Sequence, residues 1–99
     1  MNVDIQSVHF NADSKLIGYI NQKLEKLNLF SDRIIRVNVF LKLDNVVHVI
    51  KDKIAEIRVH IPRQQFFVKS TSKSFEQSFD DALNSLINQI KKEKERKAA

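Results

Sequence analysis

The sequence contains no cysteine, which excludes disulfide bonds and thiolate zinc sites. It has one glycine and one proline, so sharp turns are few and we expect regular helices and strands to dominate. No apolar stretch approaches the roughly 20 residues that a membrane-spanning helix needs. The first residues also lack the basic and apolar regions of a signal peptide. We therefore expect a cytoplasmic protein with no membrane partner.

Length and composition fit a single domain. The chain has 99 residues, of which 42% are hydrophobic and 29% charged, as in globular proteins. A chain of this length buries only about two-thirds of its unfolded surface, so it builds one compact core. We expect one domain over residues 1–99, with a basic tail from about residue 91.

The net charge of +5 is unevenly distributed along the chain. The segment 91–97 holds five basic and two acidic residues. This surplus of three positive charges is more than half of the net charge of the chain. A concentrated positive field favours a polyanionic partner. Lysines near the end of a helix also suit the negative end of its dipole, and charge alone favours this second interpretation.

Periodicity predicts six elements in the order β-α-β-β-β-α. Alternating apolar residues predict strands at about residues 3–9, 35–43, 55–61 and 65–71. Apolar residues at helical spacing predict helices at about residues 14–29 and 75–95, and the apolar stripe of the first consists of Leu16, Ile17, Ile20, Leu24 and Leu27. Side chains in 11–14 and Ser74 can cap these helices. Asp44 and Asn45 indicate a turn, although apolar residues in 46–50 could extend the hairpin.

This order predicts an α+β fold, a four-stranded sheet with two helices on one face. The last three strands follow one another on short connections, which indicates an antiparallel meander. In the second predicted strand, Ile35, Val37 and Val39 alternate with polar residues and should face the helices. The other face of the sheet should carry Arg36, Phe40, Lys42, Arg58, His60, Phe67 and Lys69.

The sequence offers no catalytic constellation and no cofactor site. It lacks a glycine-rich phosphate loop and a nucleophile elbow, and its histidines, His9, His48 and His60, have no metal-ligand spacing. Asp80 and Asp81 are adjacent in a predicted helix, so their side chains point about 100° apart and cannot share a proton. We expect a protein that is not an enzyme and has no small-molecule substrate.

The first predicted helix carries a basic stripe beside its apolar stripe. The stripe consists of Lys15, Tyr19, Lys23 and Lys26, with Arg33 just past the helix end. Basic residues with an aromatic can follow a phosphate backbone and stack on a base. The alternative is that the tyrosine flanks the core and the lysines only solvate the helix. If both helices cover the same sheet face, the stripe and the basic tail could form a groove-like positive field.

Four segments resemble the ribosome hibernation-promoting factors, also described as the protein Y or sigma-54 modulation family. They are KLEKL at 23–27 followed by DRI at 32–34, VNVFLK at 37–42, IAEIRVHIP at 54–62, and the last helix from Ser74-Phe75 to Asp80 with Leu86, Gln89-Ile90 and KKEK at 91–94. The resemblance covers nearly the whole chain. It implies a fold like that of double-stranded-RNA-binding domains, with a strand added before the first helix.

The resemblance also implies a function and a set of contacts. Family members bind the decoding channel of the small ribosomal subunit and block the sites of messenger RNA and transfer RNA, which leaves an idle ribosome under stress or in stationary phase. By this resemblance, Lys23, Lys26, Arg33, Lys91, Lys92 and Lys94 should contact ribosomal RNA phosphates. The basic stripe itself adds Lys15 and Tyr19 to the expected RNA-binding residues. The chain resembles the short form of the family, which implies that it does not pair ribosomes alone. We separately expect it to be monomeric away from the ribosome.

Two alternatives remain open from the sequence. A generic double-stranded-RNA-binding module would read RNA shape across successive minor grooves. A protein-interaction domain would use the outer sheet face, where Phe40 and Phe67 could form a small apolar patch. These phenylalanines could equally pair across strands.

Overall fold

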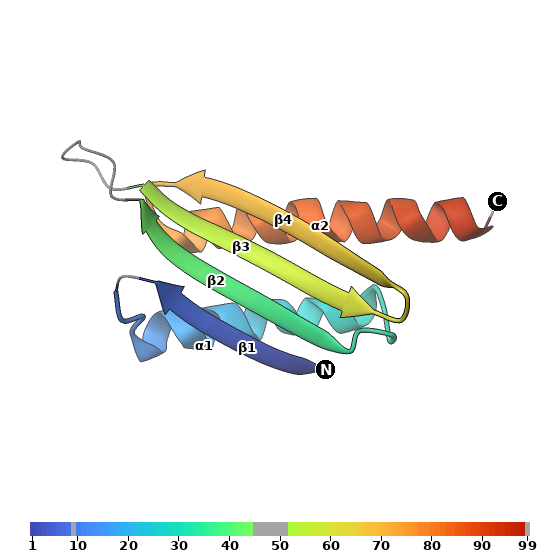
Figure 1. The fold of residues 1–99 in the computed structure, drawn as a ribbon, viewed down its shortest axis with the longest axis horizontal. Helices are drawn as coiled ribbons and strands as arrows, with labels where there is room; N and C mark the ends of the chain where they lie inside the picture. Colours follow the sequence, from blue (N-terminus) through green and yellow to red (C-terminus); the bar gives the residue numbers. More distant parts are fainter. Residues whose placement is uncertain (9, 45–51, 99) are drawn as a thin grey trace.

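The computed structural model describes residues 1–8, 10–44 and 52–98, which form a four-stranded sheet covered on one face by two helices (Figure 1). The elements are β1 (Asn2–Val8), α1 (Ser14–Leu24), the 3-10 helix η1 (Glu25–Leu29), β2 (Arg36–Asp44), β3 (Asp52–Ile61), β4 (Gln64–Ser72) and α2 (Phe75–Ala98). The predicted α+β class and element order are confirmed. The predictions for His9, His48 and the hairpin within 45–51 lie outside the described residues.

The strands lie in the order β1-β2-β3-β4. β1 runs parallel to β2, whereas β2, β3 and β4 form the predicted antiparallel meander. The parallel pair requires a crossover, which α1 and η1 provide on one face of the sheet. One row of the register runs from Val37 to Val59 and on to Phe66, so side chains of the same parity face the helices on every strand.

The core lies between the sheet and the two helices. The sheet side is fully buried at Val37, Val39, Leu41, Ala55, Ile57 and Val59. The helical side is fully buried at Ile20, Leu24, Leu27, Phe79, Ala82 and Leu86. Alternation in the strands and steps of three and four in the helices place these residues on facing surfaces. Burial of this apolar surface is the main favourable term in folding.

Three predictions of local structure are wrong. The segment predicted as one α-helix over 14–29 leaves the α-helical form after Leu24 and continues as the 3-10 helix η1. Tighter 3-10 turns are frequent at helix ends, where the last carbonyls have no regular partner. Ile35 was expected to face the helices but precedes the first residue of β2 and is 53% exposed. Ile17, expected in the apolar stripe of α1, lies at its edge and is also exposed.

Both predicted helix caps are confirmed. The carboxylate of Asp13 accepts a hydrogen bond from the backbone N–H of Leu16 at 2.7 Å, at the start of α1. The hydroxyl of Ser74 accepts one from the backbone N–H of Gln77 at 3.1 Å, at the start of α2. Each cap satisfies a donor that the helix itself leaves without a partner.

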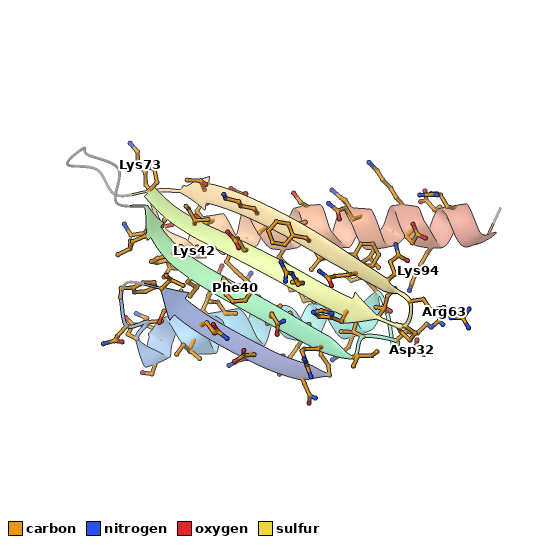
Figure 2. All side chains as sticks on the ribbon, in the orientation of Figure 1. Asp32, Phe40, Lys42, Arg63, Lys73 and Lys94 are labelled. Carbon is orange, nitrogen blue, oxygen red and sulfur yellow. The ribbon has the colours of Figure 1, made fainter. Side chains whose placement is uncertain are left out.

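The face of the sheet opposite the helices is open and carries mixed polar and aromatic side chains (Figure 2). Lys42 forms an ion pair with Glu56 at 3.1 Å, and the guanidinium of Arg58 lies 5.5 Å from the ring centroid of Phe67. Phe40 and Phe67 are not register partners, since Phe40 lies opposite Glu56 and Phe67 opposite Arg58. The two phenylalanines therefore do not pair directly across strands. None of the helices in the described ranges is long and apolar enough to cross a membrane.

Candidate nucleic-acid interface

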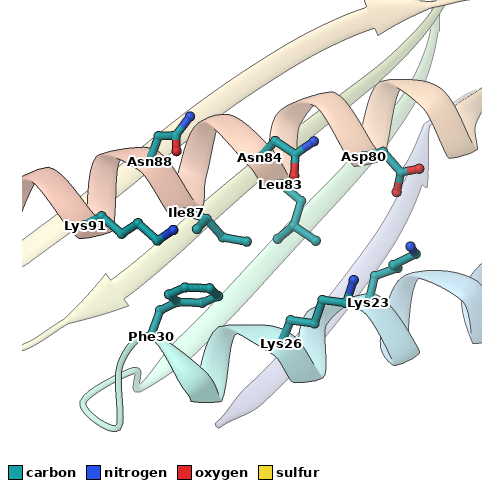
Figure 3. A pocket seen from close by; sticks show the side chains of 9 residues that line it. All are labelled: Lys23, Lys26, Phe30, Asp80, Leu83, Asn84, Ile87, Asn88 and Lys91. Carbon is teal, nitrogen blue, oxygen red and sulfur yellow. The ribbon is translucent and has the colours of Figure 1, made fainter.

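A groove of about 520 Å³ separates α1 and η1 from α2 on the helical side of the molecule (Figure 3). One wall provides Lys23, Lys26 and Phe30, and the other wall is α2. The residues from α2 are Asp80, Leu83, Asn84, Ile87, Asn88 and Lys91. They recur at steps of three and four, so one side of α2 faces the groove along about three turns.

Three lysines from the two walls converge on this groove. Lys23 and Lys26 reach from α1 and η1 toward α2, and Lys91 reaches back from α2 (Figure 3). Lys26 and Lys91 are exposed and Lys23 is half-buried, so their ammonium groups are accessible to a ligand. Three lysines against the single carboxylate of Asp80 leave the groove with a positive field that attracts a polyanion. We call this groove, with its three lysines Lys23, Lys26 and Lys91, the lysine groove.

Apolar side chains hold the lysine groove in shape. Leu83 is buried, and Ile87 and Phe30 are partly buried against the core. The ammonium of Lys91 lies 5.0 Å from the ring centroid of Phe30, within the range of a cation–π contact. This contact positions a lysine of α2 over the segment that follows η1. The long lysine side chain thus packs its stem on apolar surface and keeps its charge in solvent.

Tyr19 links the two walls of the groove. Its hydroxyl donates to the carboxylate of Asp80 across the helices, and the ammonium of Lys23 lies 5.4 Å from its ring centroid. The hydrogen bond to Asp80 raises the pKa of Tyr19 to about 12, with further contributions from burial and from the negative charges of Asp80 and Glu76. The tyrosine therefore keeps its proton well into the alkaline range and acts as a donor within the protein.

A second basic cluster lies at the end of the sheet. Arg33 and Lys94 line a small hollow of about 70 Å³ whose walls are mainly apolar. The remaining lining residues are Ser31, Ile61, Phe66, Ile90 and Glu93. The hydroxyl of Ser31 accepts a hydrogen bond from the backbone N–H of Arg33 at 3.2 Å, which fixes the loop before β2. This cluster brings a loop residue next to the end of α2.

The structure thus divides the eight predicted contact residues into groups. Lys23, Lys26 and Lys91 share the lysine groove, with Tyr19 beside it. Arg33 and Lys94 share the hollow at the end of the sheet. Lys15 and Lys92 are exposed and line neither feature. The expectation that the two basic segments meet is confirmed for these five charged residues.

Sequence reasoning missed Phe30 and the link through Asp80. Phe30 follows a helix end and has no periodic neighbours, so no pattern placed it in the groove. Asp80 was considered only as a possible carboxylate pair with Asp81. Asp80 and Asp81 indeed have different partners, because Asp81 accepts a hydrogen bond from the amide of Gln77 at 2.9 Å. Across the ranges that the structure describes, no cluster of three potential metal ligands is present.

Residues 3–98 match the family described as sigma 54 modulation protein / S30EA ribosomal protein. The fold is similar to that of a ribosomal subunit interface protein from Coxiella burnetii, with a TM-score of 0.84 and 17% identity over 95% of this chain and 98% of that one. It is also similar to the N-terminal domain of protein Y from Thermus thermophilus, with a TM-score of 0.79 and 23% identity over 93% of this chain and 98% of that one. No curated protein sequence matches the chain.

Proposed function

The chain belongs to the sigma 54 modulation protein / S30EA ribosomal protein family, and from this membership we propose that it is a ribosome hibernation factor. It binds the decoding channel of the small ribosomal subunit and blocks the sites of messenger RNA and transfer RNA. The inhibition is steric and involves no catalysis, no cofactor and no small-molecule substrate. The protein acts in the cytoplasm under stress or in stationary phase, and it is a monomer when off the ribosome.

The lysine groove is the structural observation that supports ribosomal RNA as the ligand. Lys23 and Lys26 come from the first half of the chain and Lys91 from its end, yet all three line one groove. A phosphate backbone is the class of ligand that suits several lysines in one groove, because each ammonium can contact a different phosphate. Arg33 and Lys94 continue the positive surface at the end of the sheet. The helical side is therefore the proposed ribosomal RNA interface.

The mode of binding follows from the kind of contact. Lysine contacts to phosphates carry little sequence information, so RNA shape must select the site. The protein then competes with messenger RNA and transfer RNA by filling their space. Displaced counterions make such binding weaken with salt. About five phosphate contacts predict that affinity falls more than a hundredfold between roughly 50 and 200 mM salt.

Co-sedimentation with purified small ribosomal subunits over a salt series tests the proposal. The test variant carries Lys23→Glu, Lys26→Glu and Lys91→Glu. The control carries Arg36→Glu, Lys69→Glu and Lys73→Glu, which are exposed and line neither the groove nor the hollow. Both variants change the net charge equally, and circular dichroism checks that both are folded. We expect the groove variant to bind at least tenfold more weakly, whereas the control stays near wild type.

Other outcomes point to the two alternatives. Equal affinity for a free RNA duplex and for small subunits would indicate a generic double-stranded-RNA-binding module. Binding that resists salt and survives the groove variant would direct attention to the outer sheet face around Phe67, which is 44% exposed. An assay of translation on purified ribosomes completes the test, since the proposal requires inhibition by the wild type and loss of inhibition in the groove variant.

A further inference from the structure

The turn between β3 and β4 has an unusual residue at its second position. The ladder pairs Ile61 with Gln64, so the turn consists of Pro62 and Arg63 alone. The proline ring holds its own φ near −65°. Arg63 follows with φ of 68°, and it is the one residue other than glycine with positive φ in the described ranges. A left-handed residue directly after proline is typical of a type II turn, which normally places glycine or asparagine there.

The fold gains nothing visible from an arginine at this position. A side chain in the left-handed region is disfavoured because its Cβ crowds the backbone, a penalty that glycine avoids. Arg63 is exposed, and within the described part of the chain its side chain makes no hydrogen bond or ion pair. A residue kept in a strained conformation without a structural role points to a functional one.

The turn lies at the basic end of the sheet. Ile61, which precedes the turn, lines the same hollow as Arg33 and Lys94. Figure 2 shows Arg63 and Lys94 at this end of the molecule. Glu93 forms an ion pair with Arg96 at 3.5 Å, so part of the negative charge at this end is already compensated. Three cations, Arg33, Arg63 and Lys94, therefore lie at this end of the sheet and outnumber the carboxylate of Asp32, which Figure 2 shows there as well.

We propose that Arg63 is a further phosphate-binding residue, which extends the positive surface of the lysine groove around the end of the sheet through Arg33 and Lys94. The inference rests on the proposed function, because it takes ribosomal RNA as the ligand. A guanidinium suits this task, since its planar donors can engage two phosphate oxygens at once and it remains charged at any physiological pH. The rigid turn presents it at the tip of a hairpin, clear of the protein surface.

Replacement of Arg63 by glycine separates this role from a structural one. Arg63→Gly relieves the strain, so we expect a higher melting temperature than in the wild type. We also expect three- to tenfold weaker binding to small subunits in co-sedimentation, and a salt slope reduced by about one phosphate contact. Arg63→Lys keeps a charge at the tip and should recover part of the affinity. Arg36→Gln, which removes one exposed charge from the outer sheet face, is the matched control and should bind as the wild type.

The outcomes distinguish this inference from the proposed function. If Arg63→Gly binds as the wild type while the groove variant is weakened, Arg63 is no contact and only this inference fails. If Arg63→Gly loses both stability and affinity, the arginine supports the turn and the inference is again overturned. If the groove variant also binds normally, the proposed function itself fails. Opposite changes in stability and affinity, with recovery by lysine, support the assignment.

Discussion

The hydroxyl of Tyr19 on α1 lies 2.8 Å from Oδ1 and 2.6 Å from Oδ2 of Asp80 on α2, and it donates its proton to this carboxylate. The two residues are 61 positions apart in the chain. Their hydrogen bond joins the helices that form the walls of the lysine groove. The spacing of the groove therefore depends on one neutral donor and one charged acceptor, and this pair gives the first three predictions.

Tyr19→Phe should destabilise the fold by about 1–2 kcal/mol. Hydrogen bonds to charged groups contribute roughly 1.5–3 kcal/mol, and the partly exposed position lowers this figure. The ring remains, so packing against the core is retained. Urea denaturation measures the free energy of unfolding. A value equal to that of the wild type would show that the link adds nothing to stability.

Tyr19 is the only tyrosine in the chain, which has no tryptophan, so the absorbance of tyrosinate reports this residue alone. We expect a midpoint near pH 12 in the folded protein and near 10 in urea, because Asp80 raises the folded pKa from 10.0 to about 12. Since the folded pKa is the higher one, the stabilisation is fully present below pH 10 and is lost as pH rises toward 12. Tyr19→Phe should not show this loss. A folded midpoint near 10 would contradict the hydrogen bond in solution.

Asp80→Asn should strengthen binding to small subunits at low salt by about two- to fivefold. The carboxylate lines the same groove as Lys23 and Lys91 and would repel a phosphate there. Asparagine can still accept a hydrogen bond from Tyr19 through its carbonyl oxygen, so the loss of stability should be modest. Co-sedimentation measures the affinity, with Asp81→Asn as the control because Asp81 does not line the groove. Weaker binding of Asp80→Asn would indicate that this carboxylate positions the lysines.

Phe79→Leu and Phe67→Leu should differ in their cost to stability. Phe79 is fully buried between the helices and the sheet, so the change leaves unfilled volume and should cost about 1–3 kcal/mol. Phe67 lies on the open face, where the same change should cost less than about 0.5 kcal/mol. Thermal unfolding of the two variants makes the comparison. Equal losses would mean that the open face is covered by something in solution.

The sequence predicted the elements well wherever one face of an element is buried. Strict alternation in β2, β3 and β4 placed their ends within three residues, because burial on one face fixes both the period and the register. The prediction failed at Ile35 and in the last turn of the first helix, where the chain leaves the regular element. Periodicity reports which face is buried, but it does not report how a helix ends or where a strand begins.

The charges of the candidate site and the approach of its two basic segments were predictable, but the contacts inside it were not. The stripe containing Lys23 and Lys26 is visible in the sequence because both lie on one side of a helix. Its approach to Lys91 was expected because two helices with one apolar face each cover the same face of the sheet. Phe30 and the Tyr19–Asp80 link were missed, since each is a contact between segments far apart in the chain.

The parallel pairing of β1 with β2 has a consequence for the order of folding. The chain between these strands includes all of α1 and η1, whereas β2, β3 and β4 pair with their immediate successors. When β1 pairs with β2, the long segment between them loses conformational entropy before new contacts compensate for it. Such a step is slow, so β1 should join the sheet late. No residue of β1 lines the lysine groove. The two walls of the lysine groove therefore need no contact with β1, and hydrogen exchange should find the β1 amides the least protected of the sheet.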